Sequence, residues 1–323
     1  SGIPSGWSVV EEKPKPEGKY MTMTVLDGTE GTTISPTIHG TISPLPNLQY
    51  RVNSNGDWTD FIVGTTADIQ VVSGDWVQFK GVNESGIADS TANYLYFAIS
   101  GNSVALSGNV MSLIDGIGDT TVIPSDYCFC YLFSNSNVKT VSSDFLPATT
   151  LKNDCYSWMF YNCTNLVQSP SLHVTTLASN CYAYMFRGCT SLTTAPELPA
   201  TTLAGGCYSN MFNGCSKLVN APVLPATTLD ERCYNSMFKG CSSLVNAPEL
   251  PATTLTRECY KEMFYRCMKL KYVKSLATDI TASNALYNWL NMVSSTGTFV
   301  KPAGVSYETG KSGIPSGWTV EEI

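Results

Sequence analysis

The stretch that decides the fold runs Leu198-Pro-Ala-Thr-Thr-Leu-Ala-Gly-Gly-Cys-Tyr-Ser-Asn-Met-Phe-Asn-Gly-Cys-Ser-Lys-Leu-Val-Asn-Ala-Pro-Val223. It is one of five consecutive units of 26 residues that share this pattern without an insertion. The units cover 146–171, 172–197, 198–223, 224–249 and 250–275. A fixed period of this length is typical of repeat architectures, in which each unit covers the apolar side of the next.

Within one unit, the apolar residues predict a short helix followed by an extended segment. Five of them fall at i, i+1, i+4, i+5 and i+8, one stripe of a helix: Cys207, Tyr208, Met211, Phe212 and Cys215. Gly214 stands where that helix would end, and Pro222 interrupts the extended segment that follows. Because strands lie about 4.8 Å apart and packed helices about 8–10 Å apart, stacked units are expected to bend into an arc with the helices on its convex side.

The repeat resembles a known family of bacterial surface proteins. The sequence Met185-Phe186-Arg187-Gly188-Cys189-Thr190-Ser191-Leu192 is similar to the core of BspA-like leucine-rich repeats from gut and oral bacteria of the Bacteroides type. The resemblance extends from about 120 to 280 and implies export, a cell-surface location and a role in adhesion or ligand binding. It implies no catalytic residues and no single ligand.

The flanks differ from the regular units. Cys128-Phe-Cys-Tyr-Leu-Phe133 indicates a degenerate first unit. Residues 281–293 predict a capping helix, with Leu286, Trp289, Leu290 and Val293 on one face. Between 20 and 100, turn residues separate short β-prone runs, with hairpin signals at 53–57 and 73–75; the runs are 20–26, 48–52, 61–63, 69–72, 76–80 and 94–99.

The predicted fold class is therefore α+β. We expect an N-terminal antiparallel β-domain, with an immunoglobulin-like sandwich as its candidate topology, then a curved leucine-rich-repeat solenoid and a C-terminal capping helix. The predicted division is a junction segment at 1–19, the β-domain at 20–100, the solenoid at 101–280, and a cap with a second junction segment at 281–323.

One further duplication joins the two ends of the chain. Ser1-Gly-Ile-Pro-Ser-Gly-Trp-Ser-Val-Val-Glu-Glu12 recurs as Ser312-Gly-Ile-Pro-Ser-Gly-Trp-Thr-Val-Glu-Glu322. Lys13-Pro-Lys-Pro16 then has the composition of a semi-rigid linker. We favour the hypothesis that the chain is a mature fragment, one module of a tandem array. The alternative is a lone protein whose end segments pair.

Composition limits the partners. The chain has 323 residues, 43% of them hydrophobic, and a formal net charge of −7 without a cluster of Lys and Arg. Nucleic acid and anionic membrane surfaces are therefore disfavoured as partners. The longest apolar runs, such as 93–99, are too short to span a bilayer.

The sequence carries no motif for catalysis. The only histidines are His39 and His173, and neither has a motif that pairs it with a nucleophile. A hydrolase would need an acidic pair, and Glu197 and Glu249 share one slot two units apart, or about 10 Å at strand spacing. We interpret them as rim charges.

The twelve cysteines allow three interpretations. Metal binding is disfavoured because a zinc site needs cysteine pairs two to four residues apart, whereas the regular pairs here are eight apart. Disulfides would suit an exported protein. We favour free, buried thiols, because every unit has an equivalent pair on its apolar stripe. No metal and no cofactor are predicted.

The candidate ligand-binding residues are those that vary between units. One slot, just before Ala-Pro, holds Gln168, Thr194, Asn220, Asn246 and Tyr272. These side chains could contact a sugar or peptide on a concave face, or they could be solvated surface. A second slot holds Trp158 and Tyr184, which could stack on a sugar ring or pack against the next helix.

We predict a non-catalytic, monomeric cell-surface protein, an adhesion or ligand-binding scaffold whose partner is a host or bacterial surface protein or glycan. The alternative is a carbohydrate-binding accessory module of a glycan-utilisation system.

Overall fold

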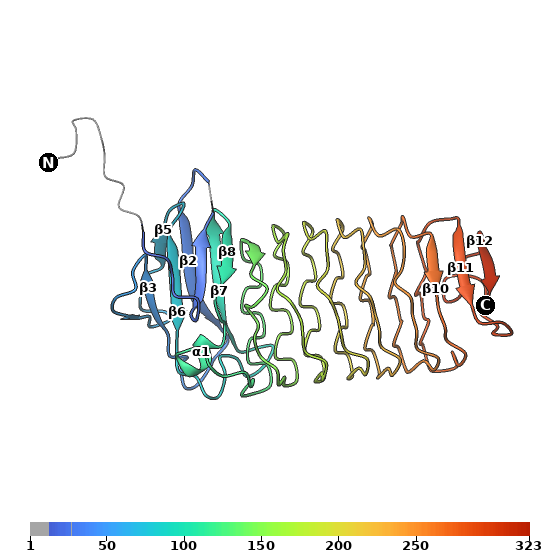
Figure 1. The fold of residues 1–323 in the computed structure, drawn as a ribbon, viewed down its shortest axis with the longest axis horizontal. Helices are drawn as coiled ribbons and strands as arrows, with labels where there is room; N and C mark the ends of the chain where they lie inside the picture. Colours follow the sequence, from blue (N-terminus) through green and yellow to red (C-terminus); the bar gives the residue numbers. More distant parts are fainter. Residues whose placement is uncertain (1–12, 27) are drawn as a thin grey trace.

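The computed structural model describes residues 13–26 and 28–323. The molecule is elongated: a β-domain lies at one end, and a straight row of coils runs from it to the C-terminal end (Figure 1). In the described ranges the only helix is α1 (Ser112–Asp115), of four residues. No helix there is long and apolar enough to cross a membrane.

The β-domain consists of two sheets that pack face to face. The larger has the strand order β4-β3-β6-β1-β8-β9 and the smaller β5-β2-β7. Phe79 and Phe97, one from each sheet, are fully buried and meet edge to face with ring centroids 4.8 Å apart. The strands are β1 (Met21–Val25), β2 (Thr32–His39), β3 (Gln49–Val52), β4 (Thr59–Asp60), β5 (Ile69–Val71), β6 (Trp76–Lys80), β7 (Tyr94–Gly101), β8 (Val104–Ser107) and β9 (Val138–Val141).

The β-prone runs locate most of these strands but not their partners. Strands overlap five of the six predicted runs, while 61–63 is not a strand and β2, β4 and β8 had no predicted counterpart. The signal at 53–57 does connect a hairpin, because β3 pairs antiparallel with β4. The signal at 73–75 connects β5 to β6, which belong to different sheets.

Residues 146–275 form stacked coils, one for each 26-residue unit, which we call the coil stack. Parallel bridges join equivalent residues of successive coils, such as Thr194 with Asn220 and Thr202 with Thr228. Equivalent rings also stack: the ring centroids of Phe186 and Phe212 lie 5.8 Å apart and the rings are 7° from parallel. The apolar column inside the coils is therefore continuous, since each unit covers the side chains of the next.

The helices predicted within each unit are wrong, because the backbone there is a run of turns with alternating hydrogen bonds. The amide of Ser157 donates to the carbonyl of Asp154 in its own coil, at 3.1 Å. The neighbouring amide of Tyr156 donates instead to Cys181 of the next coil, at 3.0 Å. Every fourth residue, such as Trp158 and Asn162, has a positive φ. This four-residue period produces the apolar spacing that we interpreted as a helical stripe.

The predicted α+β fold class, with a curved leucine-rich-repeat solenoid and a capping helix, is therefore also wrong. The described residues contain no helix in any repeat unit, and 281–293 is a run of turns and bends rather than a helix. No continuous sheet runs along the units, because only isolated bridges occur between β9 and β10 (Tyr272–Lys274). The row is straight rather than arched (Figure 1). Without helices, the spacing mismatch that was expected to bend it does not exist.

Both ends of the coil stack are covered. β9 pairs parallel with β8, so the larger sheet of the β-domain includes the degenerate first unit, and Thr140 of β9 bridges to Gln168 in the first coil. At the other end β10, β11 (Gly297–Lys301) and β12 (Trp318–Glu322) form a three-stranded parallel sheet. Trp289, fully buried, stacks on Tyr260 with ring centroids 6.3 Å apart. It closes the apolar column where the regular units end.

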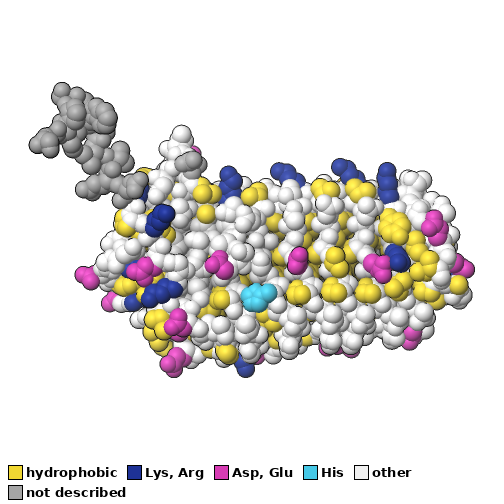
Figure 2. All heavy atoms as spheres, viewed as in Figure 1, with side chains coloured by type: hydrophobic (Ala, Val, Ile, Leu, Met, Phe, Trp, Pro, Cys, Tyr) yellow, Lys and Arg dark blue, Asp and Glu magenta, His cyan; other side chains and the backbone are white. Residues whose placement is uncertain are grey.

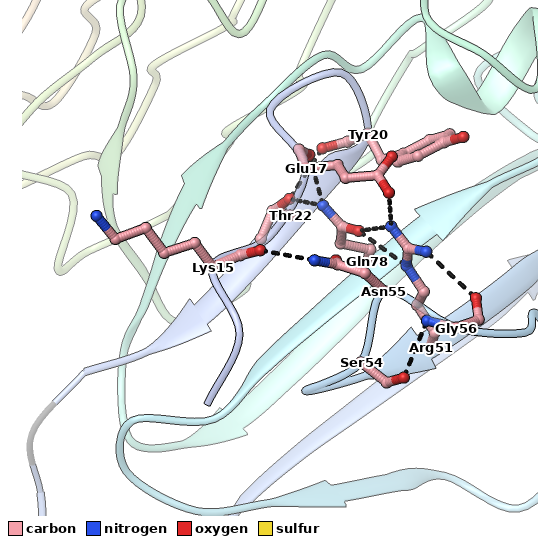
Figure 3. A network of polar contacts seen from close by, with 9 residues as sticks. All are labelled: Lys15, Glu17, Tyr20, Thr22, Arg51, Ser54, Asn55, Gly56 and Gln78. Atoms are coloured by element: carbon pink, nitrogen blue, oxygen red, sulfur yellow. Dashed lines mark hydrogen bonds and ion pairs between the residues drawn. The ribbon is translucent and has the colours of Figure 1, made fainter. Parts of the chain in front are cut away.

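Residues 13–16, which we interpreted as a linker, and the adjoining Glu17 are bound to the β-domain (Figure 3). Asn55 and Gln78 donate to the backbone carbonyls of Lys15 and Glu17, at 3.0 and 2.6 Å. The buried Arg51 holds Gln78 by two hydrogen bonds and pairs with the Glu17 carboxylate at 3.4 Å. The predicted junction segment 1–19 falls partly on residues 1–12, which lie outside the described residues, as does residue 27.

Candidate functional site

Four of the predicted ligand-binding residues form one exposed row along the coil stack, which we call the polar row. Parallel bridges link Thr194 to Asn220, Asn220 to Asn246, and Asn246 to Tyr272. Gln168 is exposed in the same slot of the preceding coil, and its bridge is to Thr140. The bridges set neighbouring side chains at strand spacing, about 4.8 Å. The polar row therefore presents donors and acceptors at regular intervals.

A shallow apolar groove adjoins the polar row. The residues that follow Thr194 and Asn220 in the chain line a cavity of about 290 Å³, formed by Ala195, Pro196, Glu197, Leu198, Pro199, Pro222, Val223 and Pro225. Val223 is 79% exposed, an unusual position for so apolar a side chain. Exposed hydrophobic side chains gather in rows along the coil stack (Figure 2). Polar and apolar contacts are thus available side by side.

Of the two glutamates that share a slot near the groove, only one forms an ion pair that the structure shows. Glu249 accepts an ion pair from Lys274, with Nζ and Oε2 2.9 Å apart. The hydrogen bond to Glu249 raises the pKa of Lys274. Glu197, in the same slot two units earlier, is exposed at the groove. The two carboxylates considered for a hydrolase therefore differ in their surroundings, because Glu249 is already paired with the ammonium group of Lys274.

Trp158 and Tyr184 lie in a separate row, which we call the aromatic row. Their centroids are 4.5 Å apart and their planes 6° from parallel. Tyr131 stacks on the other face of Trp158 at 5.1 Å, Tyr94 stacks on Tyr131, and His39 stacks on Tyr94. These contacts occupy both faces of Trp158, so a sugar ring has no free face to stack on there. The packing interpretation of Trp158 fits this geometry, and so the two predicted sets of ligand residues are not brought together.

The aromatic row uses backbone positions that aromatic residues rarely adopt. Tyr131, Trp158 and Tyr184 have φ of 60°, 55° and 60°. The left-handed conformation costs a non-glycine residue roughly 1–2 kcal/mol, whereas a stacked aromatic pair gains about 0.5–1.5 kcal/mol. Arg187 adds a cation over the Tyr184 ring, with Cζ 5.6 Å from the centroid. Stacking thus offsets the strained backbone, and the row joins the β-domain to the first coils.

Sequence reasoning missed the groove and the N-terminal part of the aromatic row. Val223 shares a slot with Glu197 and Glu249, and that exchange of charge for a branched apolar side chain is the signal that marks the groove. Tyr131 occupies the Trp158 slot of the degenerate first unit, 27 residues earlier rather than 26. Tyr94 and His39 come from the β-domain, so no repeat alignment could have included them.

Eleven of the cysteines form two buried columns, and Cys130 lies apart from them beside Ser157. All twelve are free and buried, as the buried-thiol interpretation predicts. In one column each thiol donates to a phenylalanine carbonyl, for example Cys215 to Phe186 at 3.2 Å and Cys241 to Phe212 at 3.2 Å. Burial raises the pKa of Cys215 to about 12. Within the described ranges no cluster of three His, Cys, Asp or Glu residues is placed to hold a metal ion.

No protein-family model matches the chain, and searches of curated proteins and of solved structures likewise give no match.

Proposed function

We propose that the chain is a non-catalytic binding scaffold that acts in adhesion at a cell surface, with the polar row and the adjoining groove as its binding face. The observation that carries the proposal is the alignment of Thr194, Asn220 and Asn246 by backbone bridges beside an exposed apolar groove. Each coil offers a similar small contact, so a partner that extends along several coils gains many weak contacts at once. The surface location rests on the resemblance to BspA-like repeats.

An extended segment of a surface protein suits this face best. Asparagine amides both donate and accept, as a peptide backbone requires, and the groove beside Val223 can take an apolar side chain. The carbohydrate-binding alternative loses Trp158 as a stacking platform, because stacked rings occupy both of its faces. A glycan would have to bind through the polar row, where Tyr272 is the exposed aromatic side chain, or against Tyr184.

The test is binding of the full chain to a panel of extracellular-matrix and bacterial surface proteins, alongside a glycan array. We expect a protein partner whose dissociation constant rises about tenfold for Asn220→Ala with Asn246→Ala, and again for Val223→Glu. The coil tolerates glutamate in that slot, since Glu197 and Glu249 occupy it naturally. Thr227→Glu is the matched control: it adds the same charge at an exposed residue next to the separate bridge of Thr202 with Thr228.

Each other outcome has a definite meaning. Binding that all these variants leave unchanged contradicts this choice of face. Binding to glycans alone, weakened by the asparagine variants, supports the accessory-module alternative. Absence of binding to either panel contradicts the adhesion proposal.

A further inference from the structure

The last twelve residues are built into the end of the coil stack as its final rung. We call 312–323 the closing segment. β12 pairs parallel with β11, from Gly297 with Trp318 to Lys301 with Glu322. Trp318 is 7% exposed, and its indole Nε1 donates to the carbonyl of Ser294 at 2.8 Å. A Cβ on Gly297 would lie 2.8 Å from the Trp318 ring, so the missing side chain at 297 makes room for the indole.

The start of the closing segment is held by contacts as specific as those of Trp318. The indole Nε1 of Trp289 donates to the carbonyl of Gly313 at 2.9 Å, and the amide of Asn288 donates to the Ser312 hydroxyl at 3.1 Å. Ile314 is 7% exposed. The seat of the closing segment, formed by Asn288, Trp289, Ser294, Gly297 and Lys301, thus recognises a definite side-chain pattern.

Two glycines of the closing segment are required by backbone contacts. A Cβ on Gly313 would lie 1.8 Å from the carbonyl oxygen of Glu308, and one on Gly317 would lie 2.2 Å from that of Ser295. Neither contact can be relieved by moving a side chain. The seat therefore needs a segment that begins with serine, glycine and isoleucine. After two further residues, glycine and tryptophan must follow.

The opening segment, residues 1–12, meets every one of these requirements. It is identical to 312–323 at nine of twelve positions, and it keeps Ser1, Gly2, Ile3, Gly6 and Trp7. The three positions that differ correspond to Thr319, Glu321 and Ile323, which are all exposed in the closing segment. The seat therefore does not distinguish the opening segment from the closing segment by any buried contact.

The opening segment cannot reach the seat of its own chain. Residues 13–17, which follow it, are bound to the β-domain by Asn55, Gln78 and Arg51 (Figure 3). The β-domain lies at one end of the molecule and β12 at the other (Figure 1). An occupant from the opening segment must therefore come from a second copy of this chain.

We propose that the seat of one copy binds the opening segment of a second copy in place of its own closing segment, so that copies join head to tail. Replacement is favoured over addition beyond β12, because a further parallel strand in register would place Glu11 beside Glu322. The seat is complementary to a different part of the molecule, so the association is heterologous and propagates in one direction. It goes beyond the adhesion proposal, because it uses neither the polar row nor the groove.

The closing segment competes from within the same chain. A tethered segment acts at an effective concentration of about a millimolar, so the intact chain stays monomeric at micromolar concentration. Weakening the closing segment alone shifts the competition towards the second copy.

The test uses the full chain and sedimentation velocity across the micromolar range. We expect Trp318→Ala to form concentration-dependent oligomers, while the wild type and Trp7→Ala remain monomers. The double variant Trp7→Ala with Trp318→Ala is the matched control and is expected to be monomeric. A labelled peptide of residues 1–12 should bind Trp318→Ala about tenfold more tightly than it binds the wild type, and a Trp7→Ala peptide should not bind.

A milder variant tests the proposal if Trp318→Ala does not fold. Glu322→Lys replaces the ion pair between Glu322 and Lys301 with repulsion and leaves the buried indole in place. Its far-ultraviolet circular dichroism should match the wild type, while it too forms oligomers and binds the peptide. Folded Glu322→Lys that stays monomeric and ignores the peptide overturns the proposal, as do oligomers that persist in the double variant.

Discussion

Arg232 and Glu258 pair across two neighbouring coils, with Nε and Oε2 2.7 Å apart, from backbone positions that both have a positive φ. The Glu258 side chain is 10% exposed and the Arg232 side chain 51%. Lys261 lies on the other oxygen of the same carboxylate, at 3.5 Å. The equivalent positions of earlier coils hold Asn180 and Gly206. A charged pair thus replaces residues that tolerate this conformation more readily.

We expect the Arg232–Glu258 pair to make a small contribution to the free energy of unfolding, and this contribution should be lost at low pH. The hydrogen bond from Arg232 lowers the pKa of Glu258. A lowered carboxyl pKa adds stability above the ordinary glutamate pKa of about 4.3, and this stability is lost as the pH falls through the pKa of the folded state. Arg232→Ala should reduce the free energy of unfolding by less than about 1 kcal/mol at neutral pH, because Arg232 is half exposed. Urea unfolding at several pH values measures this, with Arg257→Ala, which removes the exposed Glu231 pair, as control. A loss that stays constant down to pH 2 would contradict the prediction.

Asp154→Asn is expected to stabilise the protein. Burial raises the pKa of Asp154, and Asn180 is its hydrogen-bond partner at 3.4 Å. Its φ of 54° also favours asparagine. Because the pKa is raised in the folded state, the ionised carboxylate opposes folding. The gain from asparagine should therefore grow as the pH rises through that pKa and shrink in acid. Thermal unfolding at pH 3 and pH 7 tests this, and an equal shift at both would show that only the backbone preference matters.

Gly214→Ala should destabilise the coil stack, whereas Gly205→Ala should not. Gly214 has a φ of 81°, and the left-handed conformation costs alanine roughly 1–2 kcal/mol. Gly205 has no such conformation, and a Cβ there meets its nearest neighbour at an ordinary 3.7 Å. The two substitutions add the same methyl group to the same coil. Chemical denaturation should give a clear loss for Gly214→Ala only; equal losses would mean that crowding rather than backbone conformation is decisive.

The thiols should be inert in the native protein. All twelve cysteines are buried, and burial raises the pKa of Cys163 and Cys215 to about 12, so little thiolate exists at neutral pH. An aromatic disulfide reagent should react no faster than the protein unfolds. After denaturation without reductant it should titrate all twelve thiols. Rapid reaction of even one thiol in the native state would contradict the burial, and fewer than twelve after denaturation would indicate disulfides.

The repeat could be located from sequence because its apolar positions recur without insertion, and those positions are the buried column of the structure. Its local conformation could not. The stripe of Cys207, Met211 and Cys215 suits a helix of 3.6 residues per turn and a turn repeat of four equally well over so short a segment. The better signal was the glycine and asparagine at every fourth position, as in Gly206, Asn210 and Gly214, because these residues tolerate a positive φ.

The candidate site was only partly predictable, for a related reason. Comparison between units finds exposed slots, and it located Thr194, Asn220 and Asn246 in one row. It cannot say what flanks a slot, so the groove at Val223 was missed. It also cannot show that Trp158 and Tyr184 stack on each other, because ring stacking depends on the backbone path and not on which residues vary.

The backbone hydrogen bonds alternate between local turns and the next coil, and this pattern repeats with each unit of 26 residues. Excision of one whole unit, such as 198–223, leaves each remaining amide facing an equivalent carbonyl, so both ends keep their covers while the distance between them shortens by one increment. The stacking also survives a spacing that is one residue longer, because Tyr131 stacks on Trp158, 27 residues later in the chain. The distance between the β-domain and the C-terminal sheet can therefore change by whole units without any change to the remaining surface.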